Sequence, residues 1–322
     1  MRVASWNINS IRVRQERLIE WLKSREPDVL CLQEIKALET QFPSAAFREL
    51  GYESAVFGQK TYNGVAILSR LPMTEVARGF VGEEEGAPAG ADGDGNSSVG
   101  TPPAPLENLN RDLPLFKGSQ SVAPASPPAT PLESVAPASV PAAPQQVDVP
   151  PEAAIEARLL AATIAGVRIH SVYVPNGRTI DSESYAHKLR WLGRLGEHLD
   201  RIERAQPLLL CGDFNVAPDE RDLYNAAAFG QDVIFHQDVR DAFARLVGRG
   251  LVDTFRMFRE EPGHFSWWDY RMLAFPKNRG LRIDLILAST DLVPRITAGG
   301  IDREARKGKL PSDHAPIWVE VS

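Results

Sequence analysis

Hydrophobic residues in this chain form short runs separated by polar turns and by a few longer amphipathic stretches. The short runs predict buried or half-buried strands at 2–8, 28–34, 54–58, 65–69, 168–174, 207–214, 281–288 and 316–321. Two longer stretches, 13–25 and 183–204, repeat apolar residues at helical spacing. Their shared faces consist of Leu18, Trp21, Leu22, Leu189, Leu192, Leu199 and Ile202. Many strands with few long helices predict two packed β-sheets with helices outside, which is an α/β sandwich.

The stretch 81–157 breaks this pattern. It holds 14 of the chain's 25 prolines, no Trp or Tyr, and a single phenylalanine, Phe116. Frequent proline opposes both helix and sheet, and so little apolar bulk cannot offset the entropy lost on ordering. We therefore expect a disordered, acidic, Pro/Ala-rich insertion. Strand-like runs flank it at 64–70 and 157–174, so we expect it to interrupt a single domain that spans 1–322.

The net charge of −6 is unevenly distributed along the chain. Residues 81–157 carry 11 acidic and two basic side chains, which leaves 34 basic and 31 acidic ones elsewhere. The body of the protein is therefore slightly basic and compatible with a polyanionic substrate, despite the acidic total.

Cysteine usage and hydropathy both indicate a cytoplasmic protein. Cys31 and Cys211 lie inside apolar runs without metal-ligand spacing, so we expect buried free thiols in a reducing compartment. No apolar run approaches the roughly 18 residues that span a bilayer, and the first residues lack the apolar stretch of a secretion signal. We expect no membrane partner, and association with the nucleoid if the source is bacterial.

Polar side chains cluster where the predicted strands end or begin. These side chains are Asn7, Asn9, Glu34, Asp213, Asn215, Asp313 and His314. Taken singly, each also fits a turn former or helix cap. Asp284 is different, because it lies inside the apolar run LRIDLIL, where an unpaired carboxylate is costly. His314 is its natural partner.

The acids and amides together suit a hard cation. Carboxylate and amide oxygens are ligands for Mg²⁺, which binds through one or two carboxylates plus substrate phosphate. Zinc would favour clustered His and Cys, which six scattered His and two separated Cys do not supply. The chain has no P-loop, GxGxxG or GxSxG motif. We therefore expect Mg²⁺-assisted hydrolysis of a phosphate ester, with Mn²⁺ as a substitute metal.

Eight segments, taken in chain order, carry a family resemblance. They are WNINSIR (6–12), LQEIK (32–36), NGVAILSR (63–70), VYVPNG (172–177), GDFNVAP (212–218), FSWWDYR (265–271), NRGLRIDLIL (278–287) and SDHAP (312–316). The chain resembles the exonuclease III family of DNA-repair exonucleases and AP endonucleases, within the endonuclease/exonuclease/phosphatase superfamily. The resemblance covers 1–80 and 158–322, and it departs at Ser10, where Gly is usual, and Ile35, where Thr is common. It implies a DNase I-like, four-layer α/β sandwich of two mixed sheets flanked by helices.

The resemblance also implies a metal site and a set of catalytic groups. Glu34 would be the main metal ligand, with Asn7 and Asp313 on the metal or its waters. The full predicted metal set is Asn7, Glu34, Asp213, Asn215, Asp313 and His314. The predicted catalytic set is Tyr173, Asp213, Asn215, Asp284 and His314.

Within the catalytic set, the resemblance implies that Asp213 orients and deprotonates the attacking water and that Asn215 donates a hydrogen bond to an oxygen of the developing pentacoordinate phosphorane. Asp284 would orient His314, which contacts the scissile phosphate, and Tyr173 would contact the phosphate or the leaving oxygen. The resemblance leaves open which of Asp213, His314 and Tyr173 moves which proton, and whether one or two metal ions take part.

Substrate contacts are expected around this centre. The resemblance implies that Trp267 forms a wall of an abasic-sugar pocket, although Trp267 and Trp268 also fit core aromatics. Asn176 and Arg178 would reach the DNA backbone or an abasic sugar. The basic run Arg271, Lys277, Arg279 and Arg282 suits phosphate positioning, although it also fits a solvated loop. Asn9 and Arg12 complete the predicted DNA contacts.

The resemblance predicts a monomeric, Mg²⁺-dependent DNA-repair enzyme that acts on duplex DNA. Its activities would be cleavage at abasic sites, 3′–5′ exonuclease action and removal of 3′-blocking groups, in an order that the sequence does not rank. The alternatives are the same fold acting on a lipid or inositol phosphate, or a non-catalytic DNA-binding relative.

A short peptide within the insertion adds one partner hypothesis. Asp112-Leu113-Pro114-Leu115-Phe116 is similar to the peptide with which bacterial repair proteins dock on the replicative sliding clamp, although that motif usually begins with Gln. The competing interpretation is that the insertion is an inert linker.

Overall fold

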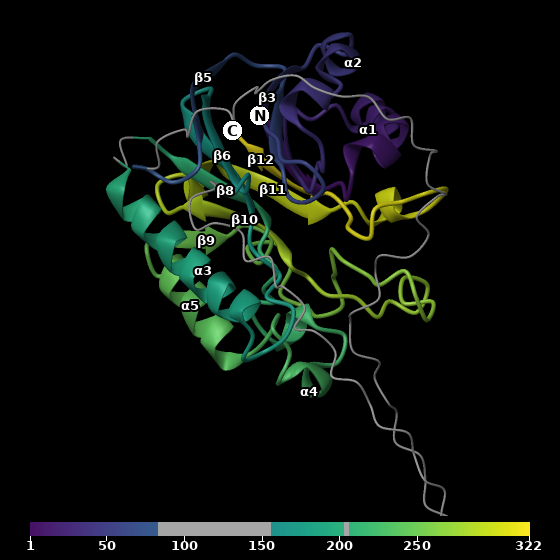
Figure 1. Cartoon of the computed structure of the whole chain (residues 1–322). Coiled ribbons are helices and arrows are strands. Elements are labelled where there is room, and N and C mark those ends of the chain that lie inside the picture. The colour runs from purple at the N-terminus through teal and green to yellow at the C-terminus, as the bar shows by residue number, and fades with distance from the viewer. Residues whose placement is uncertain (83–155, 203–205) are drawn as a thin grey trace, which may run out of the picture. The chain divides into compact units, whose positions relative to one another are not determined.

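The computed structural model describes residues 1–82, 156–202 and 206–322, and in these residues two six-stranded sheets lie face to face (Figure 1). The described residues form one compact unit. None of their helices combines the length and the apolar character that a membrane crossing needs. The predicted insertion and its peptide at 112–116 lie outside the described residues, apart from the ends of the insertion.

Each sheet is mixed, with one parallel pair among antiparallel neighbours. The first contains β1 (Arg2–Asn7), β2 (Val29–Gln33), β3 (Glu53–Phe57), β4 (Val65–Ser69), β11 (Ile296–Ile301) and β12 (Ile317–Val321). The second contains β5 (Met73–Arg78), β6 (Leu159–Ile164), β7 (Val167–Tyr173), β8 (Leu208–Asp213), β9 (Leu251–Asp253) and β10 (Asp284–Ser289). Their orders are β11-β12-β1-β2-β4-β3 and β5-β6-β7-β8-β10-β9, and the parallel pairs are β1 with β2 and β7 with β8.

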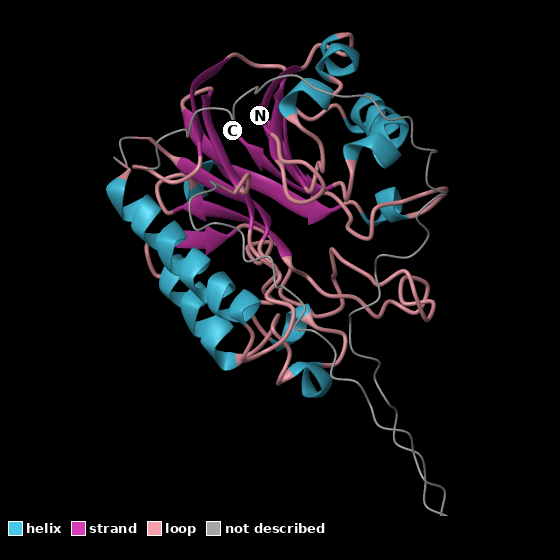
Figure 2. Cartoon of the chain, in the orientation of Figure 1, coloured by secondary structure: helices cyan, strands magenta, loops and turns pink. Residues whose placement is uncertain are grey.

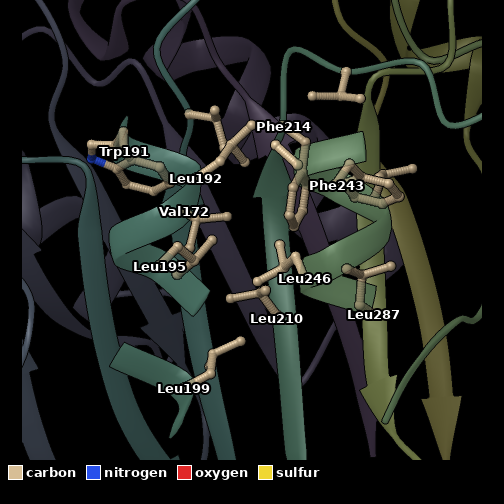
Figure 3. Close-up of a cluster of buried hydrophobic side chains, with 14 of the residues drawn as sticks. Val172, Trp191, Leu192, Leu195, Leu199, Leu210, Phe214, Phe243, Leu246 and Leu287 are labelled. Carbon is tan, nitrogen blue, oxygen red and sulfur yellow. The ribbon is translucent and has the colours of Figure 1, made fainter. Parts of the chain in front are cut away.

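Helices cover the outer faces of the two sheets (Figure 2). They are α1 (Ile11–Arg25), α2 (Ser44–Arg48), α3 (Glu183–Arg201) and α5 (Gln237–Val247). The short helix α4 (Ala226–Phe229) lies apart from the sheet faces, in a smaller apolar cluster (Figure 1). Leu18 and Leu22 of α1 join a buried cluster with the outer side chains of the first sheet. Leu195 of α3 and Leu246 of α5 pack with Leu210 on the outer face of the second sheet (Figure 3).

A third apolar cluster fills the space between the sheets. It combines Val29 and Ile67 from the first sheet with Ile169 and Ile286 from the second. The layers therefore run helix, sheet, sheet, helix, which confirms the predicted four-layer sandwich. Cys31 and Cys211, on facing strands of this cluster, are buried free thiols as expected.

The eight predicted strands are present, with ends that differ by up to three residues. The largest difference is at β10, which begins at Asp284 because Leu281 forms isolated bridges to Leu223 and Trp267 instead of a regular ladder. Strands β5, β9 and β11 were not predicted, and neither was helix α5. Strand β5 lies at a sheet edge with most of its side chains exposed, so it lacks the apolar pattern of a buried strand.

Ser10, the family departure noted above, has a strained backbone. Its φ is 86° and its ψ 108°, a conformation that glycine adopts far more readily than serine. We expect Ser10→Gly to raise the free energy of unfolding by about 1 kcal/mol, as relief of strain outweighs glycine's added unfolded-state entropy. Urea unfolding measures this change, with Ser24→Gly, in the last turn of helix α1, as a control that should lower the free energy of unfolding. An equal loss of stability in both variants would contradict the inference that the Ser10 backbone is strained.

Candidate active site

Five polar side chains from both sheets meet at one end of the sandwich. The parallel strands β1 and β2 end at or just before Asn7 and Glu34, and the parallel strands β7 and β8 end together at Tyr173 and Asp213. Strand β10 runs the other way, so its first residue, Asp284, pairs with Asp213. The strand directions therefore bring together residues that lie far apart in the sequence.

Asn7 links the carboxylates of the two sheets. Its Nδ2 donates to Glu34 Oε1 at 2.8 Å and to Asp213 Oδ2 at 2.9 Å. Its Oδ1 accepts the backbone N–H of Asn9 at 3.0 Å. The amide oxygen is thus turned away from the carboxylates, and the N–H groups of Asn7 orient both of them. The prediction of Asn7 as a metal ligand stays a prediction.

Asp284 and His314 form a buried pair. Nδ1 of His314 lies 2.8 Å from Oδ2 and 3.1 Å from Oδ1 of Asp284, which confirms the predicted partnership. With Nδ1 held in this way, Nε2 faces Asp213, 3.8 Å from its Oδ2. Burial alone would lower the pKa of His314, but Asp284 and Asp213 raise it to about 10, so the ring is an imidazolium at neutral pH.

The ionisation of Asp213 is displaced towards neutral pH. Burial is the main cause and raises the pKa of this carboxyl to about 7; the neighbouring Asp284 and Glu34 raise it further and His314 opposes them. The backbone N–H of Asn215 donates to Asp213 Oδ1 at 2.9 Å and fixes the carboxyl plane. A carboxyl that ionises near pH 7 is well matched to taking up a proton from water.

Glu34, Asp213 and His314 present ligand atoms that all lie within 4.8 Å of one another. Lys36 Nζ, 2.8 Å from Glu34 Oε2, helps keep the pKa of Glu34 below its usual value despite burial. Tyr173 donates to Glu34, and burial together with this carboxylate raises its pKa well above 10, so the phenol stays protonated. Converging carboxylate oxygens of this kind fit a hard divalent cation, whose charge would also favour ionised Asp213.

Two further predicted ligands lie beside this cluster and not in it. Asp313 accepts from Asn9 Nδ2 at 2.9 Å and from Trp267 Nε1 at 3.1 Å, one bond to each carboxylate oxygen. The Oδ1 atom of Asn215 accepts from Asn176 Nδ2 at 3.0 Å, so its amide oxygen is already engaged. These contacts place Asp313 and Asn215 next to the carboxylates, where their predicted roles stay predictions.

Arg282 was predicted to contact DNA, and the structure corrects this. Its side chain is 1% exposed. Nε bonds Asp222 at 2.6 Å and Nη2 bonds Asp253 at 2.7 Å. The guanidinium therefore neutralises two carboxylates inside the fold and cannot reach a phosphate. It braces the segment that leads into Asp284.

The remaining predicted DNA contacts differ in exposure, and their role stays a prediction. Trp267 is half-buried, bridges to Leu281 and His314, and packs on an apolar cluster that includes Ile283. Trp268 is fully buried against Phe275, as its core interpretation anticipated. Asn9 is half-buried, and the exposed members of the set are Arg12, Asn176, Arg178, Arg271, Lys277 and Arg279.

Three basic residues at the site were missed from the sequence. Lys36 donates to Asn9 Oδ1 at 2.7 Å as well as to Glu34, and the Arg158 guanidinium lies 4.8 Å from the Tyr173 ring centroid. Lys188 of α3 is fully buried, and burial lowers its pKa to about 7. A lysine among the mostly apolar residues on the buried face of helix 183–204 is the signal that could have indicated a buried cation.

Comparison with known proteins places this geometry in context. A sequence model of the Endonuclease/Exonuclease/phosphatase family matches residues 4–314. The chain is 28% identical to exodeoxyribonuclease III of Haemophilus influenzae over 333 residues, covering 99% of both chains. It is similar to the structure of an AP endonuclease from Archaeoglobus fulgidus (TM-score 0.76, 30% identity, 100% of this chain and 99% of that one). A 3′ phosphatase from Neisseria bound to a product DNA hairpin is similar at TM-score 0.76 and 29% identity, with the same coverage.

Proposed function

The chain belongs to the endonuclease/exonuclease/phosphatase family, and we propose that it is a DNA-repair phosphodiesterase of the exonuclease III type. It cleaves DNA at abasic sites, degrades duplex DNA from 3′ ends and removes 3′-blocking groups. The observation that carries this proposal is the buried Asp284–His314 pair facing Asp213, which Asn7 ties to Glu34 across the two sheets.

The geometry supports hydrolysis by in-line attack of water on phosphorus. Asp213 accepts the proton of the attacking water, and the P–O3′ bond breaks as the new P–O bond forms. The imidazolium of His314, held by Asp284, faces the phosphate and offsets its growing negative charge. The phenol of Tyr173 is protonated and would serve as donor to the leaving oxygen once its O–H turns from Glu34.

The cation that we propose for the Glu34–Asp213 oxygens is Mg²⁺, with Mn²⁺ as a substitute, because these are hard oxygen ligands. When bound, it supplies Lewis-acid stabilisation of the phosphoryl oxygens.

DNA is favoured over a lipid or inositol phosphate by the surroundings of the site. Arg178, Lys277 and Arg279 are exposed cations, which suit a polyanionic backbone. Trp267 borders an apolar cluster with Leu281 and Ile283, which suits a sugar without its base.

The test is cleavage of three duplex oligonucleotides in Mg²⁺, bearing an abasic analogue, a recessed 3′ end or a 3′-phosphate. We expect turnover of at least one, and no release of phosphate from inositol phosphates or lipid vesicles. Binding of DNA without cleavage of any duplex would favour the non-catalytic alternative.

Substitutions of Asp284 and His314 should give non-additive losses of turnover. We expect Asp284→Ala and His314→Ala each to lower kcat at an abasic site by about 10²-fold or more, because Asp284 acts through the ring it orients. The double variant should be little worse than either single one. Steady-state kinetics of the four proteins decide this, and multiplicative losses would contradict a functional pair.

We also propose that Asp112–Phe116, which lies outside the described residues, docks on the sliding clamp of the replication machinery. Leu113, Leu115 and Phe116 would fill apolar pockets, and Pro114 lowers the entropy lost on binding. A synthetic 106–118 peptide titrated against clamp by fluorescence anisotropy tests this. If Leu115→Ala and Phe116→Ala peptides bind as well as the native one, the peptide is not a docking motif.

A further inference from the structure

A buried lysine ties together three loops beside the active site. Lys188 lies near the start of α3, and its Nζ donates to the backbone carbonyls of Asn215 at 2.6 Å, Val233 at 2.7 Å and Asn176 at 3.1 Å. The side chain has no solvent exposure. An ammonium group has three N–H donors, so these three carbonyls satisfy it completely.

The three carbonyls come from different parts of the chain. Asn176 follows β7, Asn215 follows β8, and Val233 precedes α5. The first loop approaches the lysine closely, since a Cβ added to Gly177 would lie 3.0 Å from Lys188 Cδ. Lys188 therefore helps to set how the first two loops lie relative to each other, because its ammonium bonds a backbone carbonyl of each.

A chain of hydrogen bonds leads from these loops to the catalytic carboxyl. Asn176 Nδ2 donates to Asn215 Oδ1 at 3.0 Å, Asn215 Nδ2 donates to Val174 O at 3.0 Å, and the Asn215 N–H donates to Asp213 Oδ1 at 2.9 Å. The first two bonds depend on the spacing of the two loops that Lys188 holds, and the third links Asn215 to Asp213 within the second of them. A small change in that spacing would move the amides and the plane of the carboxyl together.

We propose that Lys188 is a positioning residue for the hydrolysis, which aligns Asn176 and Asn215 with Asp213 through the backbone carbonyls of their loops. This inference rests on the proposed function for its kinetic consequence, but its structural part can be measured without activity. Replacing the ammonium with an apolar group leaves three buried carbonyls without a donor, so the loops must move to find partners.

The first experiment measures the side-chain amide groups of Asn176 and Asn215 by NMR. In protein labelled with ¹⁵N-asparagine, the side-chain NH₂ resonances of Asn176 and Asn215 are assigned by their Ala variants and compared between native protein and Lys188→Met. We expect both pairs to shift and to exchange faster with solvent, because the hydrogen bonds between the loops are lost. Unchanged resonances would overturn the proposal.

The matched control is Leu199→Ala, on the same helix. Leu199 is buried on α3 at the far end of the apolar cluster from Phe214, the neighbour of Asn215 (Figure 3). Its truncation lowers stability through a cavity but leaves the loops in place. We expect the two asparagine resonances to be unaffected. Equal shifts in both variants would mean that any loss of stability moves the loops, and the proposal would fail.

The second experiment uses turnover at an abasic site, well below the melting temperature of every variant. We expect Lys188→Met to lower kcat by 10- to 100-fold, with a smaller change in KM, and to have little further effect in an Asn215→Ala background. Lys188→Gln, which keeps two N–H donors, should lose less and serves in place of the Met variant if that one does not fold. Multiplicative losses with Asn215→Ala would overturn the role. Absence of activity in the native protein would refute the proposed function and leave the NMR result to decide.

Discussion

Asp213→Asn is expected to lower turnover on abasic duplex DNA by about 10³-fold or more while duplex binding survives. The carboxyl has a pKa of about 7, so it can accept a proton from water at neutral pH, which an amide cannot do. The change keeps the size of the side chain. It should therefore remove a group that acts in the transition state and leave the fold and the DNA surface in place.

The measurement compares the single-turnover cleavage rate with the equilibrium binding affinity for the same duplex. The control is Asp219→Asn, six residues further along, whose exposed carboxylate pairs with Arg221 and caps a short 3₁₀ turn. Asparagine caps such a turn as well as aspartate, so this variant should keep full activity. Loss of binding in parallel with turnover for Asp213→Asn would mean that the residue holds substrate or structure instead.

Removal of divalent cations should abolish cleavage, and Mg²⁺ or Mn²⁺ should restore it. Glu34, Asp213, Asp284 and Asp313 are gathered around His314, and Lys36 pairs with Glu34 at 2.8 Å. This excess of negative charge is costly in a buried site, and a bound cation offsets it. Cleavage that continues undiminished in excess EDTA would contradict the metal assignment.

Two further readouts separate a site metal from one carried by the DNA. Glu34→Gln should raise the Mg²⁺ concentration that gives half-maximal rate by about tenfold, because one ligand charge is lost. Added Mg²⁺ should also raise the melting temperature of the DNA-free native protein, since a cation that binds the folded state stabilises it. The cation competes with a proton on Asp213, so this stabilisation should grow as pH rises through about 7.

Local sequence patterns were sufficient to predict the central strands and the Asp284–His314 pair. Buried central strands such as β2 and β4 are continuous apolar runs, which are visible without any knowledge of their neighbours. Asp284 stood out because a carboxylate inside such a run needs a partner, and His314 supplies it. By contrast, β5 and β11 are edge strands whose polar or Gly-rich sequences carry no such signal.

Tertiary contacts determined the roles of those side chains whose partners lie far away in the sequence. Arg282 lies in a basic stretch that suits DNA, but Asp222 and Asp253, 60 and 29 residues away, bury it. The amide of Asn7 turns its N–H groups to carboxylates of both sheets, an orientation that only the packing of the sheets imposes. The role proposed for Lys188 follows from its hydrogen bonds to backbone carbonyls of three different loops. Whether a polar side chain is buried depends on the segments that pack against it in the folded protein. The local sequence around the side chain does not show which segments those are.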